Sequence, residues 1–291
     1  MNQDALALAY RHCEQITRTR ARNFYYGIRL LPTRKRAAMC ALYAMARRID
    51  DVGDDPSRPD RLAALDEVRH SLALVAKAAS GEPAAVPPGD PVLIALADTA
   101  ERFPLPVGAF EELAEGCEWD ISGRRYETFD DLVQYCRRVA GTVGRLSLSV
   151  YGSADPEQAE VFADTLGVAL QLTNILRDLV EDRDVMGRVY LPREDLDRFG
   201  VTPDLDGSTE DLMALICFET GRAAQFYARG LPLLALLDWR SRACTATMAG
   251  IYHRLLDKVR LRPDQVLRGR ISLSRGQKAT VAAIALARGR P

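Results

Sequence analysis

Apolar residues recur at helical spacing along most of this 291-residue chain. Between proline and glycine breaks they fall at positions i, i+3, i+4 and i+7, and alternating apolar and polar runs long enough to build a sheet are missing. The pattern therefore predicts a mostly or wholly helical fold. Helices are expected at residues 2–20, 33–52, 58–79, 90–103, 107–121, 129–152, 156–185, 208–237, 241–262 and 275–288.

Two segments interrupt this helical pattern. Residues 81–90 hold three prolines and two glycines, which cannot continue a helix, so a linker is expected there. Residues 181–195 form a polar loop with Gly187 and Pro192, and loops in such a position often act as lids. No repeat period is visible, which argues against a helical solenoid. One domain spanning residues 1–291 is the default expectation at this length.

An acidic cluster stands at the end of the expected helix 33–52, in the sequence ARRIDDVGDD. Asp50 and Asp54 lie four residues apart and share one helical face, with Asp51 beside them. Like charges at this spacing repel each other, so the cluster needs either a cation or water around a helix end. Taken alone, a charge run of this kind is more often a solvated helix face than a binding site.

A second set of oxygen-bearing side chains changes that interpretation. Asn174, Asp178 and Asp182 follow an i, i+4, i+8 ladder on the expected helix 156–185 and form one stripe. The remaining surface of that helix is mostly apolar, so the stripe is expected to face the interior. Buried unpaired carboxylates are costly, and a hard divalent cation with oxygen ligands is the usual remedy. The two clusters therefore predict two walls of one metal-lined cavity.

Magnesium is the expected ion, because it prefers few carboxylates together with water and phosphate oxygens, and this preference points to a diphosphate substrate. Calcium is less favoured, since neither cluster has the glycine-containing loop spacing of an EF-hand. No P-loop or GxGxxG sequence indicates nucleotide handling. Kinases, NTPases and simple dinucleotide oxidoreductases are therefore disfavoured.

Composition narrows the remaining classes. A formal net charge of -1, with Lys and Arg spread along the whole chain, gives no footprint for nucleic acid. The six cysteines stand far apart without a CxxC pair, which argues against structural zinc and against a disulfide framework. The N-terminal residues lack the pattern of a signal peptide, and the apolar stretches are too short for a membrane span, so a cytoplasmic protein is expected.

Five segments stand in an order and spacing that chance would not reproduce. They are NFYYGIRLLP (23–32), YAMARRIDDVGD (43–54), RYETFDDLVQYCRRVAGTVG (125–144), QLTNILRDLVEDRDVMGRVYLP (171–192) and a tail that includes GRISLSRGQK (269–278). From about Phe24 to the C-terminus, the chain resembles the squalene and phytoene synthase family. The resemblance implies an all-α isoprenoid synthase fold, a single helical bundle domain around a central active-site cavity.

The resemblance also implies roles for residues at matching positions. Mg²⁺ and the diphosphates of two prenyl substrates would be bound by Asp50, Asp54, Asn174, Asp178 and Asp182. Roles close to the reacting groups are implied for Tyr135, Arg47 and Tyr43, and further substrate contacts for Phe24, Gln171, Arg177, Arg188, Tyr190 and Gly141. Without the resemblance, Arg47 would be read as a surface arginine, Phe24 as a core aromatic, and Gly141 as a point of close helix packing.

The tail segment GRISLSRGQK looks closest to bacterial presqualene diphosphate synthases of hopanoid pathways. The expected reaction therefore joins two farnesyl diphosphates into presqualene diphosphate, with release of diphosphate and without NADPH. Two alternatives stay open within the family: phytoene synthase, which uses two geranylgeranyl diphosphates, and squalene synthase, which reduces its product with NADPH. A non-catalytic assembly factor is disfavoured, because both acidic clusters are intact.

One position departs from the family pattern. Many relatives have a hydroxyl-rich or His-Ser motif just before Phe24, whereas this chain has Arg20, Ala21, Arg22 and Asn23. The arginines there are candidates to supply charge to the diphosphate in place of hydroxyls. The tail VAAIALARGRP has the composition of a short basic segment for peripheral membrane contact, although a last helix packed on the core is favoured. The sequence does not determine the oligomeric state.

Overall fold

The computed structural model describes residues 3–21, 23–55, 58–82, 87 and 89–289. Every long regular element in these residues is a helix, and they contain no strand, so the prediction of an all-α fold is confirmed. In chain order the elements are α1 (Gln3–Arg20), α2 (Tyr25–Ile28), α3 (Thr33–Asp54), α4 (Arg61–Ala79), α5 (Pro91–Arg102), α6 (Gly108–Ile121), α7 (Phe129–Cys136), the π-helical segment η1 (Arg137–Gly141), α8 (Thr142–Tyr151), α9 (Pro156–Met186), α10 (Arg193–Arg198), α11 (Thr209–Gly230), α12 (Leu233–Leu236), α13 (Trp239–Leu261), α14 (Pro263–Val266) and α15 (Arg275–Gly289).

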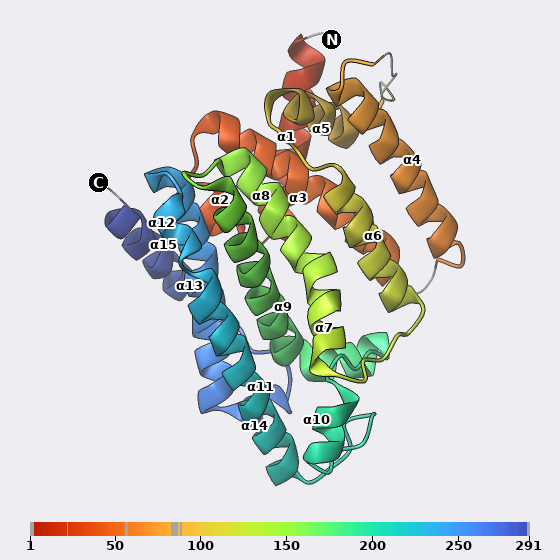
Figure 1. Ribbon diagram of the computed structural model, residues 1–291, viewed down its shortest axis with the longest axis vertical. Helices are drawn as coiled ribbons and strands as arrows, with labels where there is room; N and C mark the ends of the chain where they lie inside the picture. Colours follow the sequence, from red (N-terminus) through yellow and green to blue (C-terminus); the bar gives the residue numbers. More distant parts are fainter. Residues whose placement is uncertain (1–2, 22, 56–57, 83–86, 88, 290–291) are drawn as a thin grey trace.

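Helices α3 and α9 organise the bundle. Helix α9 packs against η1, α8, α11 and α13, while α3 packs against α1, α5, α6 and α8. Helices α1, α4 and α5 lie toward one end of the molecule, and α10 and α14 lie toward the other (Figure 1). Buried apolar residues from most of the helices join into one core cluster. The expectation of a single domain over residues 1–291 stays a prediction.

Helix ends follow local capping chemistry. Asp90 and Asp155 accept hydrogen bonds from backbone N–H groups in the first turns of α5 and α9, where a helix has unpaired donors. Gly187 adopts a left-handed conformation (φ 65°) at the end of α9, which costs little without a Cβ atom. The chain therefore leaves α9 at Gly187, and the following loop approaches the end of α3.

The structure divides two of the expected helices. The expected helix 129–152 is a succession of α7, η1 and α8, with a π-helical turn in the middle. The expected helix 208–237 ends at Gly230, because Pro232 lacks the N–H group that a continuing helix needs. Within the segment 181–195, expected as a loop, α9 continues to Met186 and α10 begins at Arg193. Helices α2 and α14, with four residues each, are too short for periodicity to reveal.

Two glycines bring η1 and α8 close to α9. A Cβ atom at Gly167 would lie 2.5 Å from the carbonyl oxygen of Ala140, and one at Gly144 would lie 2.5 Å from that of Ala163. Both separations are too short for real atoms, so these positions require glycine. The backbones therefore approach closely, which fixes η1 and α8 firmly against α9.

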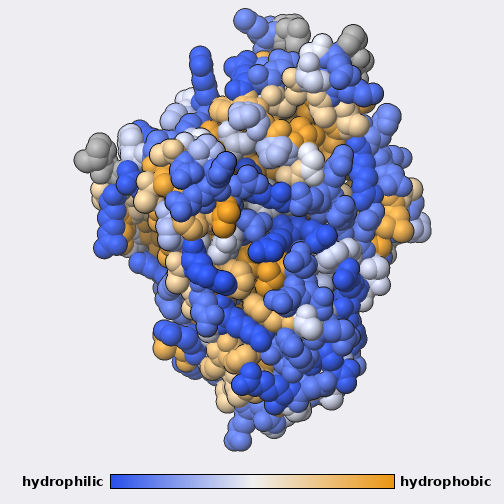
Figure 2. Space-filling view, in the orientation of Figure 1, coloured by the Kyte–Doolittle hydropathy of each residue, from blue (hydrophilic) through white to orange (hydrophobic). Residues whose placement is uncertain are grey.

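The surface of the molecule and its C-terminal helix α15 bear on the expectations about membrane contact. The face shown in Figure 2 is largely hydrophilic, with hydrophobic residues in separate groups. Helix α15 packs along α13, as a last helix on the core would. Searching the described residues finds no helix with the length and apolar character needed to cross a bilayer. Of the linker expected at residues 81–90, residues 83–86 and 88 lie outside the described ranges.

Candidate active site

The first acidic cluster occupies the last turn of α3. Asp50 and Asp54 lie one turn apart there, while Asp51 forms an ion pair with Arg47. Asp54 accepts a hydrogen bond from Arg188 at 2.9 Å. Burial, reinforced by the neighbouring Asp54 carboxylate, raises the pKa of Asp50 to about 7. The shift means that the surroundings of Asp50 disfavour its charged form.

The second set follows successive turns of α9, at the predicted spacing. Asn174 Nδ2 donates to Gln171 Oε1 at 3.3 Å, but Asn174 Oδ1 is buried without a hydrogen-bond partner among the described residues. Burial and the Asp178 carboxylate raise the pKa of Asp182 to about 7. An unpartnered buried oxygen and a carboxyl with a raised pKa both favour a nearby cation.

These donors suit magnesium better than an all-protein metal cage. Nowhere in the described residues do three Asp, Glu, His or Cys side chains group closely enough to hold an ion by themselves. Mg²⁺ commonly takes one or two carboxylates and completes its octahedron with water and phosphate oxygens. The unpartnered Asn174 Oδ1 and the raised pKa values of Asp50 and Asp182 are features that such an ion would offset. The residues therefore fit Mg²⁺ held jointly by the protein and a diphosphate.

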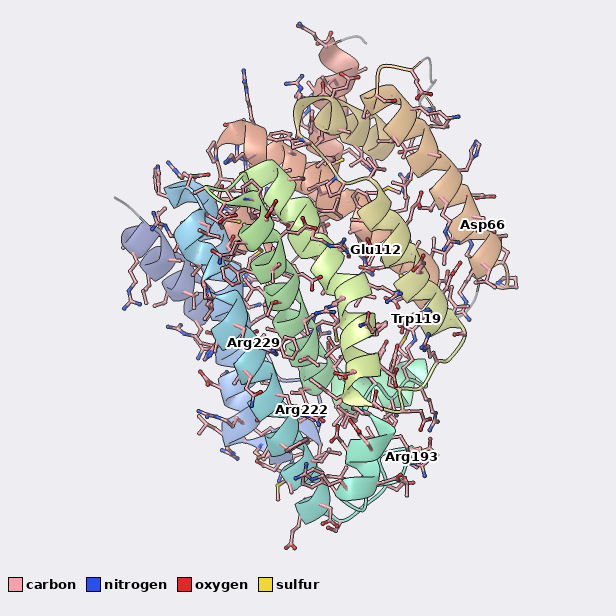
Figure 3. The ribbon with its side chains drawn as sticks, in the orientation of Figure 1. Asp66, Glu112, Trp119, Arg193, Arg222 and Arg229 are labelled. Carbon is pink, nitrogen blue, oxygen red and sulfur yellow. The ribbon has the colours of Figure 1, made fainter. Side chains whose placement is uncertain are left out.

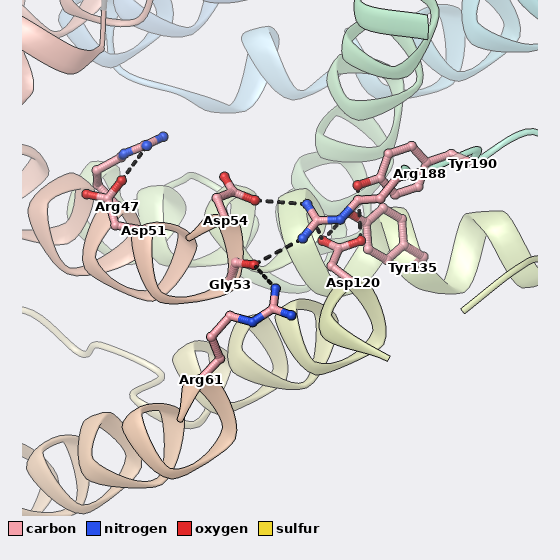
Figure 4. Close-up of polar contacts among 9 residues, drawn as sticks. All are labelled: Arg47, Asp51, Gly53, Asp54, Arg61, Asp120, Tyr135, Arg188 and Tyr190. Carbon is pink, nitrogen blue, oxygen red and sulfur yellow. Dashed lines mark hydrogen bonds and ion pairs between the residues drawn. The ribbon is translucent and has the colours of Figure 1, made fainter. Parts of the chain in front are cut away.

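Arg188 joins the loop after α9 to the end of α3 (Figure 4). Besides its bond to Asp54, the guanidinium donates to the carbonyl oxygen of Gly53 at 3.0 Å and lies 4.0 Å from Asp120. Two acids and one carbonyl therefore hold this arginine. The predicted lid residue already lies at the first acidic cluster.

Asp120, on α6, is a member of the site that sequence reasoning missed. It accepts hydrogen bonds from the hydroxyls of Tyr135 at 2.8 Å and Tyr190 at 3.0 Å, whose rings stack with centroids 5.2 Å apart. Burial raises the pKa of Asp120 to about 6, although Arg188 and the two hydroxyls act in the opposite direction. Burial also raises the pKa of both tyrosines, so their hydroxyls are protonated donors at neutral pH. A single acid in an amphipathic helix has no spacing signal that could have identified it.

An apolar cavity runs along α3, α8 and α9. Its lining extends from Asp50 back to Met39 on α3 and from Asn174 back to Ala163 on α9. Each stretch covers about 16 Å of helix at the standard rise per residue. Further lining side chains are Phe24, Ile28, Val143, Leu146, Leu233 and Met248. The acidic residues stand at one end, so the cavity matches a molecule with a charged head and a long hydrocarbon tail.

A second cavity adjoins the first, and Phe24, Tyr43 and Arg47 line both. We call it the cationic recess, since its lining includes Arg20, Arg47, Arg177, Arg270 and Lys278. Arginine and lysine groups bind phosphate oxygens through charge-assisted hydrogen bonds. The recess therefore suits a diphosphate group, while the apolar cavity suits the chain attached to it.

Two arginines of the recess also pair with the second acidic set. Arg177 binds Asp178, the next residue, and Arg270 Nε lies 3.0 Å from Asp178 Oδ1. The family resemblance implies a substrate contact for Arg177 but no role for Arg270. The available signal was its position in the tail segment GRISLSRGQK, which resembles the family.

The remaining predicted residues divide into two groups. Gln171 lines the apolar cavity beside Asn174. Tyr135, Tyr190 and Gly141 are absent from the described linings of both cavities. The two tyrosines bind Asp120 instead, and Gly141 packs against Asp164 on α9, as the packing interpretation expects.

The segment that departs from the family pattern lies at the cationic recess. Arg20, Ala21 and Asn23 line the recess, so this segment contributes an arginine to it. Arg22 lies outside the described residues. The expectation that Arg20 adds positive charge near a diphosphate therefore agrees with its position, and its role stays a prediction.

Known proteins resemble this chain along almost its whole length. A family model described as squalene/phytoene synthase matches residues 17–277. Phytoene synthases of Mycobacterium tuberculosis and Mycobacterium bovis are 50% identical over 286 residues, which cover 96% of this chain and 91% of each relative. A solved dehydrosqualene synthase in complex with ligand is 30% identical, with a TM-score of 0.84 and 97% of both chains covered. Squalene synthase HpnC from Alicyclobacillus acidocaldarius is 31% identical, with a TM-score of 0.78, covering 88% of this chain and 95% of that chain.

These matches confirm the predicted isoprenoid synthase fold and contradict the main reaction expected from the sequence. The relatives at 50% identity are named phytoene synthases, so the prediction of a presqualene diphosphate synthase is wrong. That prediction rested on the tail segment GRISLSRGQK, whose residues Arg270 and Lys278 line the cationic recess. A recess that bound the diphosphate would meet the same group on farnesyl and geranylgeranyl diphosphate. The sequence of the segment GRISLSRGQK therefore contains little information about the length of the prenyl chain.

Proposed function

The chain belongs to the squalene/phytoene synthase family, and from this premise we propose that it condenses two molecules of geranylgeranyl diphosphate head to head to form phytoene. Support for the choice within the family comes from the mycobacterial relatives, which are half identical over almost the whole chain and are named phytoene synthases. The same site would serve the more general reaction of joining two prenyl diphosphates, whatever their chain length.

The observation that supports the proposal most directly is the junction of the two cavities at Phe24, Tyr43 and Arg47. A prenyl diphosphate bound there would place its charged head in the cationic recess and its hydrocarbon chain in the apolar cavity. The bond between head and chain would then lie at the junction, beside Arg47. Binding of this kind aligns the leaving group with positive charge and keeps the reacting carbon away from water.

Magnesium is part of the proposal. Asp50, Asp54, Asn174, Asp178 and Asp182 would hold it, with diphosphate oxygens completing the coordination. When bound, Mg²⁺ neutralises the charge of a diphosphate and makes it a better leaving group. Arg270 and Arg188 pair with acids of these two sets, and both would bind diphosphate oxygens instead once Mg²⁺ occupies those acids.

The proposed reaction needs no reductant. The C1–O bond of one substrate breaks, the diphosphate leaves with the bonding electrons, and the C2=C3 double bond of the second substrate attacks the C1 cation. Loss of one proton closes a cyclopropane ring. Departure of the second diphosphate, rearrangement and loss of a second proton give phytoene, so two substrates yield one hydrocarbon, two diphosphates and two protons. The apolar lining excludes water, which would otherwise capture the cation as an alcohol.

The test is incubation of the purified protein with geranylgeranyl diphosphate and Mg²⁺, followed by mass spectrometry of the extracted hydrocarbons. We expect phytoene, formed equally with and without NADPH, and its loss in Asp54→Ala and Asp178→Ala. Farnesyl diphosphate serves as the competing substrate. Squalene that appears only with NADPH would assign the reductive reaction instead, and no product from either substrate would favour a non-catalytic family member.

A further inference from the structure

Tyr151 stands at the end of the apolar cavity that lies opposite the acidic residues. It is the last residue of α8, which packs beside α9 and connects to it through residues 152–155. Its carbonyl oxygen accepts a hydrogen bond from Lys35 Nζ at 2.6 Å, in the first turn of α3. Asp50 lies near the other end of α3, about 22 Å further along the helix at the standard rise. Tyr151 therefore marks the far end of the cavity.

The side chain of Tyr151 closes this end. Tyr151 lines the cavity and is 5% exposed, and its hydroxyl lies 3.3 Å from Cys244 Sγ on α13. The ring thus spans the distance from α8 to α13. The same end is lined by Met39 and Leu233, but Tyr151 is the largest of the three side chains.

The position of Tyr151 is fixed by a polar anchor. Besides the Tyr151 carbonyl, Lys35 Nζ binds Asp238 Oδ2 at 2.7 Å and Ser241 Oγ at 3.2 Å. Asp238 also caps α13 through the N–H groups of Arg240 and Ser241. One ammonium group therefore ties the first turn of α3, the last turn of α8 and the start of α13 together. A wall held from three helices has little freedom to yield to a longer ligand.

We propose that Tyr151 sets the maximum length of the prenyl chain that the apolar cavity accepts. This inference rests on the proposed function and deepens it. Met39 can change its conformation to fit a chain end, because methionine is flexible. Tyr151 has its backbone carbonyl held by Lys35 and its hydroxyl at Cys244 Sγ, so a chain with one more isoprene unit meets its ring. A single misplaced methylene in an apolar pocket changes specificity by about 10- to 200-fold, and an isoprene unit is larger than that.

The experiment compares Tyr151→Ala with Tyr151→Phe. Each full-length variant receives equal amounts of farnesyl, geranylgeranyl and geranylfarnesyl diphosphate with Mg²⁺, and products are quantified by mass spectrometry. In Tyr151→Ala, we expect the kcat/KM for the C25 substrate relative to the C20 substrate to rise at least about tenfold. Tyr151→Phe retains the ring and should keep the wild-type ratio. Equal ratios in the alanine, phenylalanine and wild-type proteins would overturn the proposal.

Two additions keep the result interpretable. Tyr151→Leu shortens the side chain with less loss of packing, and it should shift the ratio in the same direction should the alanine variant not fold. Affinities for unreactive thiodiphosphate analogues of the three lengths are measured as well. A wild-type protein that turns over none of the substrates would contradict the proposed function. The proposed role of Tyr151 would still be tested by binding, since Tyr151→Leu should then improve the affinity for the C25 analogue selectively.

Discussion

Arg188 Nη1 lies 2.9 Å from Asp54 Oδ1, although 134 positions separate the two residues in the chain. The arginine side chain is 11% exposed, whereas that of the aspartate is 45% exposed. Arg188 is therefore held in place before substrate arrives, while Asp54 keeps an accessible carboxylate. This arrangement suits a site that must bind an anion and a cation at adjacent points.

Replacing Arg188 by Gln should lower kcat/KM for geranylgeranyl diphosphate by about 10²- to 10³-fold, because a preorganised donor to developing negative charge is lost. Steady-state kinetics measures the effect. Arg193→Gln is the matched control: Arg193 forms a half-exposed ion pair with Asp197 on α10 and should change kcat/KM by less than about threefold. Similar losses in both variants would mean that Arg188 has only a structural role.

Binding of Mg²⁺ with a diphosphate analogue should stabilise the fold, because ligands that bind only the native state raise its unfolding free energy. At a concentration 100 times the Kd, the gain is about 2.7 kcal/mol. Thermal melts with analogue alone, Mg²⁺ alone and both together should show the largest rise in Tm for the pair.

Asp178→Asn should abolish most of this stabilisation. Asp66→Asn, a change of the same type at an exposed position on α4, should retain it (Figure 3). An undiminished rise in Tm for Asp178→Asn would remove Asp178 from the proposed magnesium site.

A buried acid pair makes stability depend on pH at the α10–α11 contact. Asp195 and Glu219, each 2% exposed, share the guanidinium of Arg222, which lies on α11 (Figure 3). Burial, together with the Asp195 carboxylate, raises the pKa of Glu219 well above its usual range, against the effect of Arg222. The folded state therefore binds a proton that the unfolded state releases at lower pH.

The unfolding free energy should accordingly fall as pH rises from the ordinary pKa of a glutamate toward the raised value, by at most about 1.4 kcal/mol per pH unit for one group. Glu219→Gln imitates the protonated form and should flatten this part of the profile. Urea unfolding at a series of pH values provides the measurement, with the exposed Glu67→Gln as control. A profile with the wild-type slope in Glu219→Gln would assign the pH dependence to another group.

Gly167→Ala should destabilise the protein by about 1–3 kcal/mol, because the new Cβ atom would meet the backbone of η1, which cannot move aside as a side chain would. Gly221→Ala on α11 is the matched control. No atom lies within 4 Å of a Cβ atom built there, so this change should stabilise the helix by about 0.5–1 kcal/mol. Chemical unfolding measures the unfolding free energy of both variants. A change in the same direction in both would mean that the packing around Gly167 relaxes to admit the new Cβ atom.

The residues that sequence reasoning placed well are those whose geometry is local. Asp50 and Asp54 share a face because four residues make about one helical turn, and the same rule places Asn174 beside Asp178. These relations hold before any tertiary contact forms.

The contacts that were missed join distant segments. Asp120 meets Tyr135 and Tyr190 only after α6, α7 and the loop beyond α9 have assembled, and no spacing along the chain predicts that meeting. The preferred chain length was misjudged for the same reason. A motif that lines the recess is easy to recognise, whereas the end of the apolar cavity is formed by side chains from α3, α8, α12 and α13 that have no common pattern.

In the proposed reaction, the junction at Phe24, Tyr43 and Arg47 would separate the residues around the breaking C1–O bond from the residues that limit the length of the prenyl chain. If Tyr151 limits the chain length, mutations at the far end would accumulate without damage to the ionisation chemistry. In evolutionary terms, a lineage with this architecture would then exchange one isoprenoid substrate for another through a few substitutions near Tyr151. For the same reason, substitutions near Tyr151 would be the first choice for engineering products with new carbon skeletons, because they would leave the residues around the diphosphate unchanged.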